Sequence, residues 1–421
     1  KSTTKPEGVE DLGENDDTTK NFDANNNFYY CNGLPFAPSF SLYSEATDTT
    51  YFEQPAKATG NDRFDNAPNK DDWYETIKLN YGVDYCNPCG ERTEHFDPIP
   101  STWKKMTDIL LFWARKGVDG FRCDMAEMVP SAFWTYAIKE VKNEFPYILF
   151  IGEVYNPSLY DTYLQSGFDY LYDKVGMYDC VRGVIAGTRK PTEITKQWQA
   201  TDHIKSKMLY FLENHDEQRI ASPFFANDAE KGFPGVVVSS LLLPNPFMLY
   251  AGQELGEPGM DAEGFSGRDG RTTIFDYWGI DKLYRGYYKK NALTAQEKVI
   301  WDKYNAILRI ASKEKVVSVG SFFDLMYANP LTSNFNSNSL YAFIRAYKQE
   351  VLLVVANFSD LEMQCAINIP RHAFEHLSLS EGQVNAVDLL TGETTFQIFS
   401  PEKPFKVGID PYGARVYKFT L

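Results

Sequence analysis

One stretch decides the fold of this chain: it runs Gly-Val-Asp-Gly-Phe-Arg-Cys-Asp from Gly117 to Asp124. It has the length and composition of a short buried strand, and it ends on Arg122 and Asp124. Because these two residues are two apart on an extended strand, their side chains point to the same side. The arginine can keep the carboxylate of Asp124 ionised and in position. A carboxylate directly after a buried strand is costly unless it is paired or functional, so Asp124 is a candidate nucleophile.

The segments around this strand alternate between strand and helix. Apolar residues at helical spacing predict one helix between Pro100 and Gly117, and another from Pro130 to Glu144. Apolar runs predict strands at 118–124, 148–151, 168–172, 208–212 and 246–250. This alternation predicts parallel β/α organisation, and both a doubly wound sheet and a (β/α)8 barrel fit it. No glycine-rich phosphate motif follows a strand, so the nucleotide-binding form of the doubly wound sheet has no support.

The two ends of the chain read differently from this middle part. The first 75 residues or so are polar and irregular, yet their aromatic residues favour an ordered segment over a disordered one. Acidic residues cluster there and could bind calcium, but their spacing matches no defined calcium loop, and a solvated acidic face is the preferred interpretation. A helix is predicted over 294–313. After residue 316 the pattern changes to paired strands separated by turn residues, which predicts an all-β sandwich.

Composition excludes several classes of function. The formal net charge of −15 argues against a nucleic-acid partner, which needs lysine and arginine to replace phosphate counterions. No apolar run of about 18 residues exists, so no membrane span is expected, and the composition is that of a soluble globular protein. The first eight residues lack the apolar core of a signal peptide, and the compartment stays open. Aromatic residues make up 15% of the chain, which indicates a large core or surfaces that stack on flat ligands such as sugar rings.

The cysteines give no clear metal motif. Six are spread thinly over the chain, and Cys86 and Cys89 form a lone Cys-x-x-Cys. Zinc ribbons need two such pairs, and no second pair exists. A local disulfide and unpaired thiols are both compatible with the spacing, and no residue is assigned to a metal site.

Three acidic residues share one context, because Asp124, Glu153 and Asp216 each follow an apolar strand. In a parallel barrel those strand ends form the mouth, where catalytic residues from several strands converge. His215 is a polar neighbour of Asp216, as Arg122 is of Asp124. Paired carboxylates without a cofactor motif point to glycoside hydrolysis, which needs one acid to protonate the leaving oxygen and one carboxylate to attack the sugar. Serine-hydrolase and zinc-protease motifs do not occur.

Residues 120–124, 152–153 and 213–216 resemble, in the same order, three signature strands of the α-amylase family of glycoside hydrolases. The resemblance implies that Asp124 is the nucleophile, Glu153 the general acid/base and Asp216 the transition-state stabiliser. It also implies supporting or substrate-binding roles for Arg122, His215 and Arg219. Tyr155 is either a platform for a neighbouring sugar or a packing residue.

The resemblance further implies a (β/α)8 TIM barrel, an irregular excursion domain and a C-terminal all-β sandwich. We assign residues 1–85 to the excursion domain, 86–315 to the second part of the barrel and 316–421 to the sandwich. Leu79-Asn80 and the stretch Tyr250 to Glu254 resemble further family motifs. Glu127 and Met128 stand where many amylases have a Lys-His pair, so that sugar contact and calcium ligand are not carried over. No cofactor is expected to be required, and calcium lacks a clear motif.

A second departure concerns the start of the barrel. Too few strands precede Val118, so the sequence resembles barrel strands four to eight without one to three. A barrel without three strands has open edges and an exposed interior, and we expect the missing segment on a separate chain or outside this sequence. The expected partner in catalysis is an α-glucan such as starch or a maltooligosaccharide, hydrolysed with retention. A transglycosylase or isomerase of the same family, and a catalytically inactive carbohydrate-binding barrel, are the alternatives.

Overall fold

The computed structural model describes residues 8, 10–45, 47–259, 268–272 and 279–421. The chain divides into two compact units, which are described separately. Unit 1 comprises Lys1–Val154 and Ser158–Asp169, and unit 2 comprises Tyr155–Pro157 and Tyr170–Leu421. This division does not test the domain boundaries at residues 85 and 315, which stay predictions.

Unit 1 begins with an irregular segment that is ordered by buried aromatic side chains. Tyr29 and Tyr30 are buried, and the hydroxyl of Tyr29 donates a hydrogen bond of 2.6 Å to the carbonyl of Val83. In the described part of this segment, the strands form two small antiparallel ladders, β1 with β2 and β3 with β4. These strands are β1 (Tyr43–Ser44), β2 (Thr49–Thr50), β3 (Val83–Asp84) and β4 (Thr93–Glu94). The aromatic residues therefore supply the core that the missing helices and long strands would otherwise give.

The rest of unit 1 is a strand–helix repeat. Its elements are α1 (Ser101–Arg115), β5 (Gly120–Cys123), η1 (Ala126–Met128), α2 (Ser131–Glu144), β6 (Leu149–Gly152) and α3 (Tyr160–Gln165). β5 and β6 pair in parallel, with Cys123 opposite Gly152. The helices α1 and α2 pack through aromatic side chains, with the rings of Trp103 and Phe133 5.9 Å apart. The parallel pair confirms the predicted β/α organisation for these two strands.

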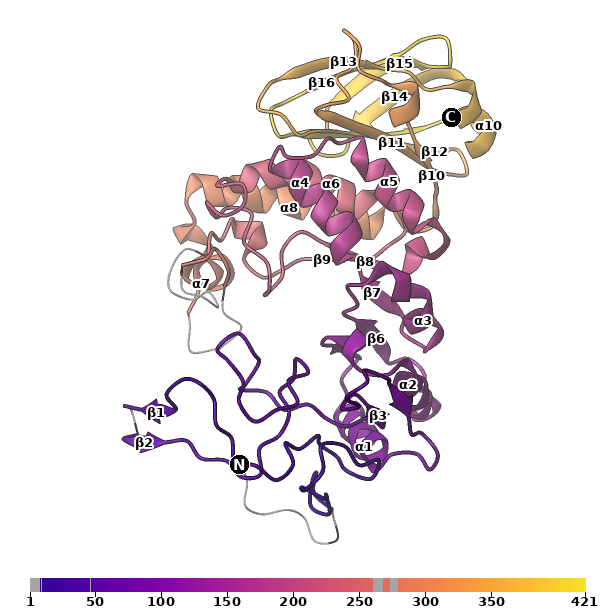
Figure 1. The fold of residues 1–421 in the computed structure, drawn as a ribbon. Coiled ribbons are helices and arrows are strands. Elements are labelled where there is room, and N and C mark those ends of the chain that lie inside the picture. Colours follow the sequence, from indigo (N-terminus) through magenta and orange to yellow (C-terminus); the bar gives the residue numbers. More distant parts are fainter. Residues whose placement is uncertain (1–7, 9, 46, 260–267, 273–278) are drawn as a thin grey trace. The chain divides into compact units, whose positions relative to one another are not determined.

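Unit 2 continues the repeat with three more parallel strands. β7 pairs with β8, and β8 pairs with β9 (Figure 1). Every residue of β8 is buried, as expected for a parallel strand with both faces covered. The elements are β7 (Tyr170–Tyr172), η3 (Lys174–Tyr178), α4 (Asp179–Ile185), α5 (Glu193–Ala200), η4 (Asp202–Lys207), β8 (Met208–Phe211), η5 (Ala229–Gly232), α6 (Phe233–Leu241), β9 (Phe247–Met248), η6 (Gln253–Leu255), α7 (Asp281–Tyr288), η7 (Lys290–Ala292), α8 (Ala295–Lys313) and α9 (Lys315–Val319).

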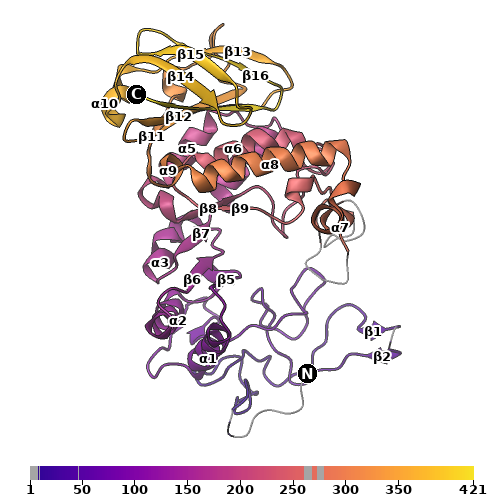
Figure 2. The same ribbon diagram turned by 180° about the vertical axis from the view of Figure 1, so that it is seen from behind.

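The C-terminal part of unit 2 is the predicted β-sandwich. A six-stranded antiparallel sheet has the order β10-β11-β12-β17-β14-β15, and β13 pairs with β16 in a second sheet. Figure 2 shows α8 and α9 next to this β-domain, and α9 contacts β11. Its elements are β10 (Ser321–Asp324), η8 (Met326–Ala328), β11 (Leu340–Tyr347), β12 (Glu350–Asn357), β13 (Met363–Ile367), α10 (Arg371–Leu377), β14 (Gly382–Asp388), β15 (Thr394–Phe399), β16 (Phe405–Ile409) and β17 (Ala414–Thr420).

A buried arginine joins this β-domain to the helices of unit 2. Arg345, on β11, donates to the carbonyl of Leu241 at 3.0 Å, of Val317 at 2.7 Å and of Gly320 at 2.8 Å. These carbonyls lie at or near helix C-termini, where carbonyls lack intrahelical partners and a cation is favourable. Burial lowers the pKa of Arg345 to about 10, so its guanidinium stays charged at neutral pH.

Two further predictions are answered by the structure. All six cysteines are described and are free thiols, so the Cys86–Cys89 disulfide considered above is not formed. Within the described residues, no helix has the length and apolar character needed to cross a bilayer.

Candidate active site

The ends of β5 and β6 bring Asp124 and Glu153 to one guanidinium. The parallel register puts Cys123 opposite Gly152, so the next residues on the two strands are Asp124 and Glu153. Arg122 Nη1 lies 2.5 Å from Asp124 Oδ1, and Arg122 Nη2 lies 2.8 Å from Glu153 Oε1. The sequence pattern predicted the first of these ion pairs but not the second. Arg122 therefore fixes both carboxylates relative to each other.

The two carboxylates differ in their surroundings. The side chain of Asp124 is 74% exposed, whereas that of Glu153 is 2% exposed. Glu153 Oε2 accepts a hydrogen bond of 2.9 Å from the backbone N–H of Met125, and the carbonyl of Glu153 accepts one of 3.0 Å from Ala126. Met125 adopts the left-handed conformation, with φ of 42°, in the turn that follows β5. Glu153 is therefore held rigidly, while Asp124 is open to an incoming ligand.

Asp216 and His215 lie on the loop after β8 in unit 2. The side-chain oxygen of Asn214 accepts hydrogen bonds of 2.9 Å from the backbone N–H groups of both Asp216 and Glu217, which shapes this turn. His215 Nε2 lies 3.2 Å from Asp216 Oδ2. His215 and Asp216 therefore contact each other, as the sequence predicted.

Arg219 has a different position from the one expected of a substrate contact. Its side chain is completely buried, and it donates to Glu213 Oε2 and Thr272 Oγ1, both at 2.8 Å, and to the carbonyl of Ala251 at 2.9 Å. The guanidinium also lies over the ring of Tyr250, 4.0 Å from its centroid. In this structure Arg219 neutralises buried Glu213 and supports the loop, which fits a positioning role better than direct binding of a sugar.

A network that the sequence reasoning missed holds the loop of Asp216. Lys174 lies 3.1 Å from Glu217 and 3.0 Å from Asp179, and the hydroxyl of Tyr178 donates to Glu217 at 3.0 Å. Arg182 donates to the side chain of Gln218 at 3.0 Å. The residues of this network are Lys174, Tyr178, Asp179, Arg182, Glu217 and Gln218. The signal was available, since Lys174 follows a predicted strand just as the three acids do.

Asp173 was also missed, although it too follows an apolar strand. It is buried, and its Oδ1 accepts a hydrogen bond of 2.8 Å from Met177, while Oδ2 has no partner within the described residues. Burial raises the pKa of Asp173 to about 6. A fourth acid therefore belongs to the set of strand-end carboxylates.

The remaining predicted residues add less. Tyr155 is partly buried, and Glu127 offers its backbone carbonyl to the hydroxyl of Tyr163 at 3.1 Å. Among the described residues, no three His, Cys, Asp or Glu side chains lie together as a metal site would require. In the N-terminal acidic cluster, Asp16 accepts hydrogen bonds from the backbone of Asn27 and Phe28 rather than presenting open oxygens. That no cofactor is required stays a prediction, and no step below uses calcium.

Residues 99–302 match the family model described as the α-amylase catalytic domain. This region thus resembles the α-amylase catalytic domain. Among curated relatives, Neopullulanase 2 of Thermoactinomyces vulgaris is 22% identical over 325 residues, which cover 76% of this chain and 48% of the relative. Alpha-amylase 3 of Dictyoglomus thermophilum is 25% identical over 282 residues, which cover 62% and 54%. The chain thus spans about half the length of these relatives.

Solved structures support the same fold. An Anoxybacillus α-amylase superposes with a TM-score of 0.58 at 18% identity, covering 79% of this chain and 65% of that one. The maltogenic α-amylase AmyB of Thermotoga neapolitana gives a TM-score of 0.57 at 18% identity, covering 79% and 69%. Among the curated relatives, a shorter sequence match is to an α-1,4-glucan:maltose-1-phosphate maltosyltransferase of Cereibacter sphaeroides. It is 37% identical over 57 residues, which cover 14% of this chain and 10% of that protein. The predicted fold class, a part of the α-amylase barrel with a C-terminal β-domain, is confirmed.

Proposed function

We propose that this chain carries the catalytic carboxylates of a retaining glycoside hydrolase that acts on α-linked glucans such as starch or maltooligosaccharides. The single observation that supports this most is the pair of contacts from Arg122 to Asp124 and Glu153. Retention needs two carboxyl groups about 5–5.5 Å apart, and contact with one guanidinium keeps Asp124 and Glu153 near each other, which supports this proposal. The names of the relatives, amylases and a neopullulanase, indicate the α-glucan as substrate class.

In the proposed mechanism the exposed carboxylate is the nucleophile. Asp124 attacks the anomeric carbon, and the bond from that carbon to the leaving oxygen breaks while Glu153 gives its proton to that oxygen. Glu153 then takes a proton from water, and the resulting hydroxide displaces Asp124 and releases the sugar with its original configuration. The proposed first step needs Glu153 as the neutral acid, and Arg122, whose Nη2 lies 2.8 Å from Glu153 Oε1, stabilises the carboxylate formed by that step.

The other proposed roles follow from the loop after β8. Asp216 accepts hydrogen bonds from sugar hydroxyls and stabilises the positive charge of the transition state, and His215 donates to the same sugar. Arg219 and the Lys174–Glu217 pair keep that loop in place. Tyr155 stays a proposed platform for a neighbouring sugar. A further barrel segment, on this or another chain, stays part of the proposal.

Sugar transfer is the second candidate function. The maltosyltransferase match reported above favours transfer. In transfer, the same covalent intermediate reacts with a sugar hydroxyl instead of water. Product analysis separates the two reactions, since hydrolysis creates new reducing ends and transfer does not.

The test is the Asp124→Asn variant of the full-length protein. We expect the release of reducing ends from soluble starch and maltoheptaose to fall by about 10⁴-fold or more, because the nucleophile is removed. Asp119→Asn is the matched control, since Asp119 is an exposed acid just before the same strand and should leave the rate unchanged. Full activity of Asp124→Asn would refute the assignment, and turnover without new reducing ends would select the transferase.

A further inference from the structure

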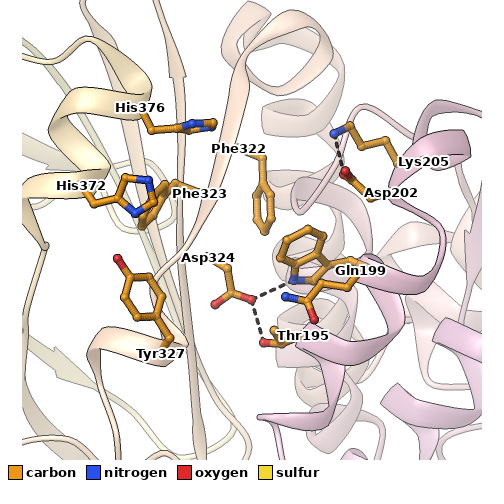
Figure 3. Close-up of a pocket in the computed structure, with 11 residues that line it drawn as sticks. Thr195, Gln199, Asp202, Lys205, Phe322, Phe323, Asp324, Tyr327, His372 and His376 are labelled. Carbon is orange, nitrogen blue, oxygen red and sulfur yellow. Dashed lines mark hydrogen bonds and ion pairs between the residues drawn. The ribbon is translucent and has the colours of Figure 1, made fainter.

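Unit 2 contains a cavity of about 350 Å³ that none of the candidate active-site residues lines. It lies where α5 and η4 meet β10 and α10 (Figure 3). Aromatic and imidazole rings supply most of its walls: Trp198, Phe322, Phe323, Tyr327, His372 and His376. Its volume is at the lower end of the range of ligand pockets, about 300–1,000 Å³, which suits one or two sugar rings.

The rings form two opposite walls. On one side Trp198 and Phe322 meet edge to face, with centroids 5.0 Å apart. On the other side Phe323 contacts His372 at 5.5 Å and Tyr327 at 6.1 Å. Tyr327 is 63% exposed, so its ring is accessible to a ligand from solvent. The walls therefore offer flat apolar surface to something that enters from solvent.

Asp324 lies between the two walls (Figure 3). Its Oδ2 accepts hydrogen bonds from Thr195 at 2.7 Å, from Trp198 Nε1 at 2.8 Å and from the hydroxyl of Tyr341 at 2.8 Å. Its Oδ1 accepts only the backbone N–H of Met326, at 2.7 Å. All four donors are neutral, and within the described ranges no lysine or arginine forms an ion pair with this carboxylate. A carboxylate oxygen has room for a second donor, so Oδ1 can accept a hydroxyl from a ligand.

We propose that this cavity is a second binding site for α-glucan, separate from the carboxylates that carry out the reaction. Sugar rings present apolar C–H faces, which pack on aromatic rings, and hydroxyl groups, which donate to a carboxylate. The unpaired charge of Asp324 and the net charge of −15 disfavour phosphorylated and acidic ligands. The choice of α-glucan among neutral sugars rests on the proposed function. The inference that the aromatic cavity and Asp324 bind a neutral sugar does not depend on that function.

The test uses β-cyclodextrin, a cyclic α-glucan, and isothermal calorimetry on the complete protein in the Asp124→Asn background, so that the probe is not consumed. Tyr327→Ala should weaken one class of β-cyclodextrin sites about two- to tenfold, as expected for the loss of one aromatic contact. Binding to granular starch should fall with it. In the otherwise unchanged enzyme, Tyr327→Ala should leave the rate on maltotriose as it is.

Phe396→Ala is the matched control, because Phe396 is a 71% exposed ring on β15 of the same β-domain and lies outside the cavity. His376→Ala gives a second, independent variant of the cavity wall. Equal β-cyclodextrin binding in Tyr327→Ala, His376→Ala and the control would overturn the proposal. A metal site would also overturn the proposal, because His372 and His376 are one helical turn apart. In that case Zn²⁺ would bind, His376→Ala would abolish this binding, and β-cyclodextrin would not bind.

Failure of the proposed function is read separately. If Asp124→Asn retains full activity, the catalytic assignment is wrong, but β-cyclodextrin binding still reports on the cavity. If Asp124→Asn is inactive and β-cyclodextrin binding is insensitive to Tyr327, the catalytic assignment stands and the second site is wrong.

Discussion

At the scale of single residues, acids at strand ends receive very different surroundings. Asp124 is open to solvent, Glu153 is buried against an arginine, and Asp173 is buried with only backbone donors. Because water stabilises a charged carboxylate, burial raises the pKa of Asp173. Buried Asp173 is where the consequence for stability is clearest.

We predict that Asp173 makes the protein less stable as the pH rises through 6. Its pKa is raised from the ordinary 3.8 to about 6, so the folded state binds this proton more tightly than the unfolded chain does. The stabilising contribution of the protonated Asp173 carboxyl is therefore complete below pH 3.8 and is lost as the pH rises through 6. This loss changes the free energy of unfolding by about 3 kcal/mol. Urea unfolding of wild type and Asp173→Asn between pH 4 and 7 measures it.

Asp173→Asn should show a flatter pH dependence, because the amide keeps the Oδ1 acceptor for Met177 and cannot ionise. Asp202→Asn serves as the control, since Asp202 is an exposed acid paired with Lys205 and should not alter the slope. Parallel pH profiles for wild type and Asp173→Asn would contradict the prediction.

The sequence indicated which acidic residues follow strands, but it did not indicate which groups surround their side chains. Asp124, Glu153 and Asp216 could be found because a charge after an apolar run is rare and costly. The burial of Arg219 and its contact with Glu213 could not, because both depend on how residues 213, 219 and 272 meet in space. The same holds for the second ion pair of Arg122, which needs the register of two strands.

At the scale of elements, the segment after β7 supports the loop after β8. Lys174 joins Asp179 to Glu217, and Glu217 is next to Asp216 in the chain. The sequence predicted both strands but not this link, because ion pairs between loops leave no periodic pattern. Strand lengths were also less predictable: the strand expected at 246–250 is only Phe247–Met248, since Gly252 has a φ of 95° and the chain turns there.

We predict that Lys174→Met lowers kcat about tenfold, because the loop that carries Asp216 loses its cation and moves out of register with the substrate. KM should change less than kcat, and Lys174→Arg should restore much of the rate. Steady-state kinetics on maltoheptaose gives both parameters. Lys205→Met, which breaks the exposed pair with Asp202, is the control; an equal effect of both variants would show that Lys174 has no positioning role.

At the scale of the whole molecule, Arg345 connects the C-terminal β-domain to the helices of unit 2. The change of pattern near residue 316 was enough to predict an all-β segment, and its antiparallel sheets confirm it. The sequence could not indicate that one arginine in an apolar strand, Leu340–Tyr347, reaches three carbonyls on other elements.

We predict that Arg345→Met lowers the free energy of unfolding by about 3 kcal/mol or more, because buried carbonyls lose charged donors. The shift of the thermal midpoint, followed by circular dichroism, measures this loss. Arg371→Met is the matched control, since Arg371 is an exposed arginine of the same β-domain that pairs with Glu381 and Glu402. A loss no larger than that of the control would mean that the three hydrogen bonds of Arg345 do not stabilise the protein.

The shared contacts of Arg122 have one more consequence, for the charge of the site during turnover. Under the proposed roles, the reaction starts with Asp124 negative and Glu153 neutral, and after the first step Asp124 is a neutral ester and Glu153 is negative. The negative charge therefore passes from one end of a single guanidinium to the other, and the sum over the three side chains stays zero. The surrounding dipoles then need little reorganisation between the two steps, and the arginine works as a fixed counter-charge for a moving electron pair.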